Sequence, residues 1–310
     1  MYSRFTTLQN HSEEDQERLE NSTAAIIGLG ATGSAIAENL ARHGVNLIII
    51  DRDYLEEKDA YSSSLYTPEQ CEKALPKAKA AEDYLKQFTG VEAYSESFKP
   101  DNTDLIEEAD IILDGTDNLE TRQVINDYSK KQGIPWIYTA AIAEKAYSMP
   151  IIDKCFNCMV QKPQKVATCE TDGVMREVAR VAAAKSVYKA VKMLTGSSVD
   201  ERLELVDKNR FLKVEDSGCE VCESEVFPHL DQTARVSKLC GRGKYQFEKN
   251  ISDENIAQAV KAGEKLAEND YLVRIGYEGR EITFFRSGRV IVEARDEGHA
   301  ESLISEVAGI

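Results

Sequence analysis

Two C-x-x-C pairs give the sequence its clearest chemical pattern. Cys155 and Cys158 form the first pair, and Cys219 and Cys222 form the second. Each tight turn brings two thiolates to one ion, and two such turns complete a tetrahedral Zn²⁺ site. The rival interpretation is a redox dithiol, which normally uses a single C-x-x-C. A closed set of four thiolates leaves no open coordination position, so the spacing predicts a structural zinc site that stabilises the fold.

Cys169 lies outside both pairs, in the stretch QKPQKVATCETDGVM. Lysines precede it, and the sequence predicts a long helix from Val174 to Leu194 after it. A thiol near cations and a helix N-terminus has a lowered pKa and nucleophilic thiolate character. Two interpretations stay open at this point: a nucleophile, or a small half-buried side chain that fills space.

Gly28, Gly30 and Gly33 form a G-x-G-x-x-G motif between a predicted strand at residues 24–27 and a predicted helix. Small residues let the backbone approach a phosphate, and the helix N-terminus offers N–H groups. A second predicted strand ends at Asp51, whose carboxylate can accept hydrogen bonds from ribose hydroxyls. The pattern predicts a nucleotide site, but it does not distinguish ATP from NAD. An NAD-dependent dehydrogenase therefore stays open here.

Two aspartates and a lysine are further candidates for this site. Asp114 and Asp117 follow another buried strand, and ligands of open α/β sheets bind at the carboxyl ends of strands. A carboxylate there suits Mg²⁺ that bridges phosphates, since Mg²⁺ takes hard oxygen ligands. The alternative is an ordinary capping aspartate. Lys77 begins a predicted helix within reach of phosphates; its alternative is a solvated side chain.

The composition limits the classes of partner. Of 310 residues, 42% are hydrophobic and 30% are charged, and the formal net charge is −16. No basic cluster is present that would displace counterions from phosphates, so we expect no nucleic acid partner. No apolar run reaches the roughly 18 to 20 residues of a membrane span, and the N-terminus has no signal pattern. We expect a cytoplasmic protein with no membrane partner.

The elements that position these residues alternate between strand and helix over most of the chain. This order predicts an α/β fold: a Rossmann-like doubly wound, mostly parallel sheet with a zinc-clipped antiparallel extension around Ile151 and Leu205. From about Lys244 the pattern changes to β-α-β-β-β-α, with a serine-capped helix over residues 252–268. We predict a larger nucleotide-binding domain with the zinc site at 1–240 and a small α+β domain at 241–310.

Several segments together resemble the ThiF/MoeB/HesA family, the bacterial and archaeal relatives of ubiquitin-activating enzymes. The matching stretches are YSR, IIGLGATGS, IIIDRDYLE, LPKAKAA, ILDGTDN, CFNC, TCETDGVM, KMLTG and GCEVC, in this order over about residues 1–222. A dehydrogenase has no reason to carry both cysteine pairs and DGTDN in this order. The resemblance therefore favours ATP over NAD.

The resemblance implies a reaction and its partners. MgATP adenylates the C-terminal glycine carboxylate of a small ubiquitin-fold carrier protein of the ThiS or MoaD type, which ends in Gly-Gly. The acyl-adenylate is then prepared for thiocarboxylate formation, with a sulfur donor protein as a further partner, in thiamin or molybdenum cofactor biosynthesis. The resemblance implies that Gly28, Gly30 and Gly33 cradle the nucleotide, that Asp51 binds its ribose and that Lys77 faces its phosphates. It implies that Asp117 binds Mg²⁺ and that Arg4 reaches into the other subunit of a homodimer. Cys169 would serve sulfur relay or conjugation.

Two positions depart from the family pattern. Asp59 stands where the family has Asn, and Ser62 stands where it has Arg. A serine does not replace bidentate phosphate binding by a guanidinium, and an added carboxylate repels an anion. Arg52, Lys58 and Arg122 are candidates to substitute. A second hypothesis is therefore a non-catalytic or weakly active nucleotide-binding scaffold, and a third is an enzyme that adenylates a small-molecule or RNA-borne carboxylate.

Overall fold

The computed structural model describes residues 3–160, 173–215, 218–231, 237–239, 243–249, 251–286 and 288–309. The chain divides into two compact units. The first comprises Met1–Asp53, Glu57–Thr67 and Pro76–Thr233, and the second comprises Tyr54–Glu56, Pro68–Leu75 and Ala234–Ile310. The predicted domains at 1–240 and 241–310 stay a prediction.

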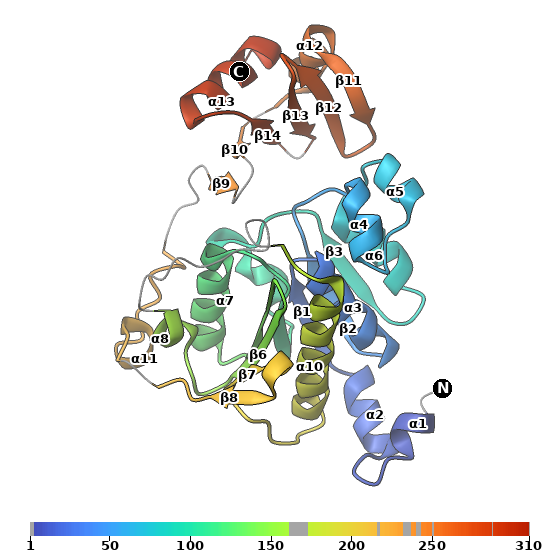
Figure 1. Cartoon of the computed structure of the whole chain (residues 1–310), viewed down its shortest axis with the longest axis vertical. Helices are drawn as coiled ribbons and strands as arrows, with labels where there is room; N and C mark the ends of the chain where they lie inside the picture. Colours follow the sequence, from blue (N-terminus) through green and yellow to red (C-terminus); the bar gives the residue numbers. More distant parts are fainter. Residues whose placement is uncertain are drawn as a thin grey trace. The chain divides into compact units, whose positions relative to one another are not determined.

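Within the described residues, an eight-stranded sheet forms the centre of the first unit (Figure 1). Its order is β3-β2-β1-β4-β5-β6-β7-β8; the first five strands pair in parallel, and β6 to β8 extend the sheet antiparallel. This confirms the predicted fold class. The strands are β1 (Thr23–Ile27), β2 (Asn46–Ile50), β3 (Val91–Tyr94), β4 (Ile111–Asp114), β5 (Trp136–Ile142), β6 (Lys145–Ile151), β7 (Leu203–Leu205) and β8 (Arg210–Leu212).

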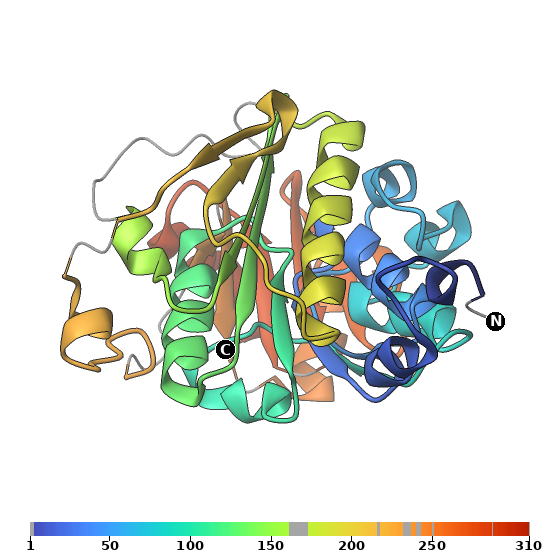
Figure 2. The same cartoon turned by 90° about the horizontal axis from the view of Figure 1, so that it is seen from below.

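Helices cover both faces of this sheet, as Figure 2 shows for α7 and α10 on opposite sides of the strands. Helix α3 packs on β1, β2 and α10, α10 packs on β5 and β6, and α7 packs on β4 and β5. The helices of this unit are α1 (Ser3–Thr6), α2 (Glu13–Glu20), α3 (Ala31–Arg42), α4 (Glu57–Ser62), α6 (Lys77–Leu85), η1 (Pro100–Ile106), α7 (Leu119–Gln132), α8 (Phe156–Val160), α10 (Arg176–Leu194), η2 (Val206–Lys208) and α11 (Glu220–Glu223).

The sequence explains why these elements form where they do. Strands β1, β2 and β4 are nearly continuous apolar runs, because a parallel sheet with helices on both faces buries both sides of each strand. Asn118 caps α7 by accepting a hydrogen bond from the Thr121 N–H, and Gly133 ends this helix with a left-handed backbone. The parallel pairing of these strands holds the glycine turn after β1 and the aspartates at the ends of β2 and β4 at one edge of the sheet.

The second unit contains a six-stranded antiparallel sheet of order β11-β12-β13-β14-β10-β9 among the described residues. Two helices, α12 and α13, pack on each other and share a buried apolar cluster with the sheet. The elements are α5 (Pro68–Glu72), β9 (Ser237–Leu239), β10 (Lys244–Glu248), α12 (Asp253–Ala262), β11 (Glu264–Glu268), β12 (Leu272–Tyr277), β13 (Arg280–Phe285), β14 (Arg289–Glu293) and α13 (Glu297–Ala308).

One predicted helix is shorter than the sequence indicated. The Ser252 cap is confirmed, since its hydroxyl accepts from the Asn255 N–H. The helix does not continue to residue 268, however: it ends at Ala262, and residues 264–268 form β11. The backbone at Gly263 approaches Gly276 so closely that a Cβ atom would lie 2.7 Å from the Gly276 oxygen. Glycine permits this approach, and the residues after it pair with β12.

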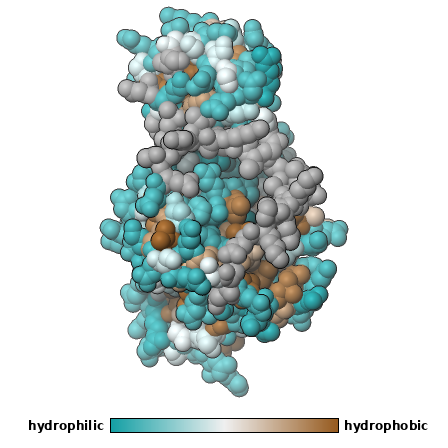
Figure 3. All heavy atoms as spheres, turned by 90° about the vertical axis from the view of Figure 1, so that its left-hand side faces the viewer, coloured by the Kyte–Doolittle hydropathy of each residue, from teal (hydrophilic) through white to brown (hydrophobic). Residues whose placement is uncertain are grey.

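Hydrophilic side chains cover much of the face in Figure 3, and apolar ones are scattered among them. This agrees with the charged fraction of 30%. Among the described helices, none is both long and apolar enough to cross a bilayer.

Candidate functional site

A pocket of about 270 Å³ lies in the first unit at the carboxyl ends of β1, β2 and β4. Strands β1 and β4 are neighbours, and the chain winds from β1 towards β3 on one side and from β4 towards β5 on the other. Ligands of open α/β sheets bind at such a switch point. Of the residues predicted for the nucleotide, Gly28, Gly30, Asp51, Lys77 and Asp117 line this pocket, and Gly33 does not.

The three glycines of the motif have different surroundings, so glycine serves a different purpose at each position. Gly28 has φ +88°, and a Cβ atom on Gly33 would lie 1.8 Å from the Gly28 oxygen. These two positions are therefore needed for close packing of β1 on α3. A Cβ atom on Gly30, in contrast, would meet nothing within 4 Å. Gly30 precedes α3 without a side-chain cap, so the open space beside it is suited to an anion at the helix N-terminus.

Asp51 follows the last residue of β2, close to where the second strand was predicted to end, and it is buried. Its carboxylate accepts hydrogen bonds from the Leu29 N–H at 2.6 Å and the Asp53 N–H at 2.7 Å. Burial raises the pKa of Asp51 from 3.8 to about 6, and the neighbouring Asp53 carboxylate contributes to the rise. The Asp51 side chain thus ties the glycine turn to the β2 end while it faces the pocket.

Asp114 and Asp117 have different surroundings. Asp114 is fully buried; its carboxylate accepts from the Thr116 N–H and hydroxyl and from Arg122 Nε at 2.8 Å. Burial raises the pKa of Asp114 although the Arg122 guanidinium acts to lower it. Asp117 is exposed and lines the pocket. Asp114 therefore holds the loop, and Asp117 is the aspartate of the two that can face a cation.

Lys77 forms a buried ion pair with Asp59. The Lys77 Nζ atom lies 3.0 Å from Asp59 Oδ1, and the two side chains are 10% and 6% exposed. Burial alone lowers the pKa of Lys77, but the carboxylates of Asp51, Asp53 and Asp59 outweigh it and raise the pKa. The departure at position 59 therefore places a carboxylate directly on the lysine predicted to face phosphates.

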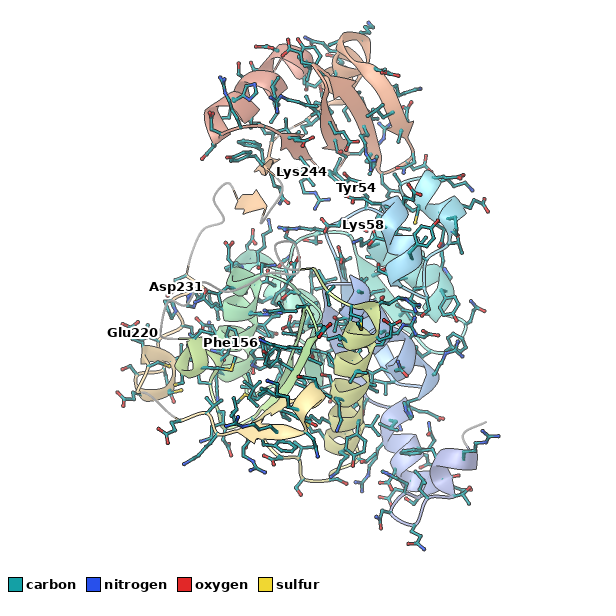
Figure 4. All side chains as sticks on the ribbon, in the orientation of Figure 1. Tyr54, Lys58, Phe156, Glu220, Asp231 and Lys244 are labelled. Carbon is teal, nitrogen blue, oxygen red and sulfur yellow. The ribbon has the colours of Figure 1, made fainter. Side chains whose placement is uncertain are left out.

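The substitute cations suggested by the sequence lie in different places. Arg52 and Arg122 line the pocket, whereas Lys58 is exposed on α4 and does not (Figure 4). Arg122 also donates to the Thr139 oxygen at 3.3 Å, so it is part of the fold. Ser62 is near Asp59, with its hydroxyl 3.4 Å from the Asp59 oxygen, and is not among the pocket residues.

One predicted residue lies elsewhere, and one is not described by the structure. Arg4 is exposed on α1 and does not line the pocket of its own chain. Cys169 lies outside the described residues. The sequence analysis missed Asp53 and Glu96, which also line the pocket. The signal was available, because both follow the carboxyl ends of strands, β2 and β3.

The four predicted zinc ligands come together in the first unit. The Sγ atoms of Cys155, Cys158, Cys219 and Cys222 all lie within 4.8 Å of one another. Cys219 Sγ is 3.7 Å from Cys155 Sγ and 3.6 Å from Cys158 Sγ, and Cys158 Sγ is 3.7 Å from Cys222 Sγ. Zn–S bonds of about 2.3 Å in tetrahedral geometry separate sulfurs by about 3.8 Å. The residues present therefore fit a Zn²⁺ ion.

The surroundings of the thiols disfavour thiolates in the absence of a metal ion. Burial raises the pKa of both Cys219 and Cys222, so neutral thiols are favoured when no cation is near. The cluster joins α8 to α11, on which Figure 4 labels Phe156 and Glu220. Strands β6 and β7 of the antiparallel extension are already joined by backbone pairing. The cluster therefore links the helical turns beside this extension and not the strands themselves.

Helix α7 supplies an outer layer to this cluster that the sequence did not reveal. Asn126 is fully buried, donates from Nδ2 to Cys155 Sγ at 3.4 Å and accepts from the Phe156 N–H at 2.8 Å. Asp127 is also fully buried and accepts from the His229 N–H at 2.9 Å, with His229 Nδ1 at 3.0 Å. These contacts fix the first cysteine-bearing turn, and the segment that follows the second, to one helix.

Comparison with known families decides the class of protein. The model of the ThiF family matches residues 2–221. The chain belongs to the ThiF family. This confirms the resemblance expected from the motifs.

Relatives with named activities agree with this membership. The chain is 31% identical to a Bacillus subtilis protein named sulfur carrier protein ThiS adenylyltransferase, with 99% of each chain covered. It is 25% identical to the SAMP-activating enzyme E1 of Haloferax volcanii, over 66% of this chain and 80% of that one. It is 26% identical to Drosophila willistoni MOCS3, an adenylyltransferase and sulfurtransferase, of which it spans 56%. The predicted class of enzyme, an adenylyltransferase, is confirmed.

Solved structures support the fold. E. coli MccB has a TM-score of 0.59 at 17% identity, over 68% of each chain. The crystal structure of PaaA has a TM-score of 0.52 at 20% identity, over 65% of this chain and 66% of that one. At these identities the likeness concerns the fold alone.

Proposed function

We propose that this enzyme uses ATP to adenylate the C-terminal carboxylate of a small ubiquitin-like sulfur-carrier protein. The B. subtilis relative, which matches over 99% of both chains, is named for ThiS, and the H. volcanii relative is named for SAMP. The single observation that carries the proposal is the pocket at the sheet's switch point, where Gly30 leaves open space before α3. A phosphate group fits this space because the helix N-terminus favours anions.

The proposed reaction needs alignment more than acid–base chemistry. A carrier carboxylate is already ionised at neutral pH, so its oxygen attacks the α-phosphorus without a general base. The new C–O–P linkage forms as the bond to the bridging oxygen breaks, and pyrophosphate leaves with that electron pair. Asp51 would orient the ribose, and Lys77 would face the phosphates. Catalysis then comes from positioning and from charge stabilisation on the phosphates.

Two metal ions belong to the proposal. Asp117 is the exposed pocket carboxylate that would hold Mg²⁺, which neutralises phosphate charge. Zn²⁺ at the four cysteines would be structural, because four thiolates leave no open position. Cys169, outside the described residues, is proposed to act after adenylation in sulfur or acyl transfer.

Carrier-dependent exchange of labelled pyrophosphate into ATP tests the reaction. We expect exchange with a carrier that ends in Gly-Gly and none with the same carrier shortened by its last glycine. The Asp117→Ala variant should lose exchange while its circular dichroism spectrum and thermal unfolding stay like wild type, since Asp117 is exposed. Absence of exchange with any small carrier would refute the proposal.

We also propose a homodimer in which Arg4 reaches the pocket of the other subunit. Arg4 is exposed and does not line its own pocket. Mixing Arg4→Ala with Asp117→Ala protein provides the test, because each mixed dimer then holds one site with both residues intact. Exchange should return to about a quarter of wild type after subunit mixing. If mixing restores nothing, Arg4 does not act across subunits.

A second candidate function is a nucleotide-binding scaffold with little or no catalysis. The buried pair of Asp59 with Lys77 favours it, because the phosphate-facing cation is already partnered. Calorimetry separates the two. Binding of MgATP without pyrophosphate exchange, across carriers of the ThiS and MoaD type, would favour the scaffold, and exchange would exclude it.

A further inference from the structure

Every cation of the nucleotide pocket faces a carboxylate of the same chain. Among the described residues, three basic side chains line the pocket: Arg52, Lys77 and Arg122. Lys77 Nζ lies 3.0 Å from Asp59, Arg122 Nε lies 2.8 Å from Asp114, and Arg52 Nε lies 3.8 Å from Asp53. The carboxylates that line the same pocket are those of Asp51, Asp53, Glu96 and Asp117. A bare triphosphate therefore meets little net positive charge.

The Lys77 pair differs from the Arg122 pair in what else holds it. Arg122 also donates to the backbone oxygens of Thr116 and Thr139, so its position is fixed by the fold. Asp59 holds the Lys77 ammonium from α4, with both side chains nearly excluded from water. Solvent screening between them is weak in such a setting. Asp51 and Asp53 also act on the Lys77 charge, and Asp59 lies in direct contact with it.

We infer that Asp59 is a positioning residue that makes this site take up a nucleotide only as its divalent-metal complex. It holds Lys77 in place and offsets its charge, so phosphate affinity comes from the metal that accompanies the nucleotide. In the absence of a divalent cation, nucleotides bind more weakly the more phosphates they carry. The inference rests on the proposed nucleotide pocket and deepens it by naming the form of the ligand.

Simple electrostatics gives the direction of this effect. A phosphate oxygen in contact with Lys77 Nζ would be about 3 Å from the ammonium and about 6 Å from the Asp59 carboxylate. Because the interaction falls with the inverse of distance, repulsion from Asp59 removes roughly half of the attraction by Lys77. A Mg²⁺ ion reverses the balance, since MgATP carries two fewer negative charges and the metal is attracted by Asp117 and its neighbours.

Calorimetry with full-length wild-type protein tests the ligand form. AMP, ADP and ATP are titrated once with excess Mg²⁺ and once with EDTA in place of Mg²⁺. We expect ATP to bind at least as tightly as AMP with Mg²⁺, and at least about tenfold more weakly than AMP with EDTA. Metal-free ATP that binds as tightly as AMP would overturn the inference.

Two substitutions at position 59 separate charge from positioning. Asp59→Asn keeps an oxygen that accepts from Lys77 and removes the charge. We expect it to tighten ATP binding in EDTA by about tenfold and to lower KM for ATP, with kcat within about twofold of wild type. Asp59→Ala also releases Lys77, so we expect kcat to fall by about tenfold or more. If Asp59→Asn leaves the EDTA affinity unchanged, the inference is wrong.

Glu204 supplies a matched control. Its carboxylate is 3% exposed and pairs with Lys189 Nζ at 3.0 Å, on β7 and α10 outside the pocket residues. Glu204→Gln removes one buried negative charge, as Asp59→Asn does, and should leave the order of AMP, ADP and ATP in EDTA as in wild type. An equal shift in both variants would assign the effect to net charge and overturn the inference. Failure of MgATP itself to bind would instead refute the proposed function.

Discussion

The cysteine cluster and the nucleotide pocket are two ligand sites of the same unit, but they are prepared in opposite ways. In the cluster, four like donors lie within 4.8 Å of one another, three of their sulfur–sulfur distances are 3.6–3.7 Å, and a cation would hold them together. In the pocket, the charged groups already satisfy one another, as Lys77 and Asp59 do at 3.0 Å. The cluster is thus arranged for one ion, whereas the cations of the pocket are already paired with carboxylates of the chain.

The two sites should also differ in how much they contribute to the free energy of unfolding. A metal bound by buried thiolates adds its binding free energy to folding. A pocket lined by paired charges contributes modestly, because desolvation offsets the attraction within each pair. Substitutions in the cluster should therefore act mainly on stability, and substitutions in the open part of the pocket should act mainly on ligand affinity.

The largest effect is expected for Cys155→Ser, which tests the cluster side. Cys155 is fully buried, so the variant should lose its zinc and at least about 4 kcal/mol of unfolding free energy. Metal content by mass spectrometry and urea unfolding measure both. Cys71→Ser is the control, since Cys71 lies in the second unit outside the cluster, and it should retain the metal. Full metal content in Cys155→Ser would show that the four cysteines do not form the metal site.

Gly33→Ala and Gly30→Ala form the next test, on the pocket side. A methyl group on Gly33 would overlap the Gly28 oxygen, so we expect Gly33→Ala to destabilise the fold by about 3 kcal/mol or more. Gly30→Ala meets no atom and should unfold like wild type, yet weaken MgATP binding by about tenfold or more, because its methyl fills the proposed phosphate space. Thermal unfolding and calorimetry decide. A Gly30→Ala protein with unchanged MgATP affinity would place the phosphates elsewhere.

The sequence predicted the cysteine cluster completely and the pocket in part. A metal site can be predicted from the sequence because residue type and spacing alone indicate its chemistry, as for Cys155 and Cys158. The glycine turn and Asp51 were readable for the same reason. The ion pair of Asp59 with Lys77 was not, because it joins α4 to α6 and depends on the path of the chain between them. Asn126 behind the cluster gave no signal, since a helical asparagine has many uses.

The mostly parallel sheet and most element positions followed from apolar runs and turn residues, whereas the strand order was not predicted. The prediction failed at residues 264–268, where Glu-Lys-Leu-Ala-Glu has good helix formers but pairs with β12. Tertiary pairing overrides local propensity at such a place. The general lesson is that local chemistry was predictable and partnerships across the fold were not.

Asp51→Asn tests the pocket side through pH. Because burial raises the pKa of Asp51 to about 6 from 3.8, the folded state binds the extra proton between these values. Wild type should therefore lose about 2 kcal/mol of unfolding free energy as pH rises from 4 to 7 through this group. Asp51→Asn should lack that part of the loss, while its affinity for nucleotide falls. Urea unfolding at pH 4.5 and 7.5 measures it, and parallel curves for the two proteins would contradict it.

The smallest effect is expected for Asn126→Ala, which asks whether the cluster is as self-sufficient as its four sulfurs indicate. Asn126 donates to Cys155 Sγ and holds the Phe156 N–H, so its loss leaves the ligands in place but less well oriented. Zinc affinity, measured by chelator competition, should fall by about 10- to 100-fold, without loss of the metal at saturating zinc. If the affinity does not change, the four thiolates alone set it, and the contrast with the pocket becomes sharper. A fall of the expected size shows instead that both sites depend on contacts across the fold, and that they differ only in which contacts a sequence reveals.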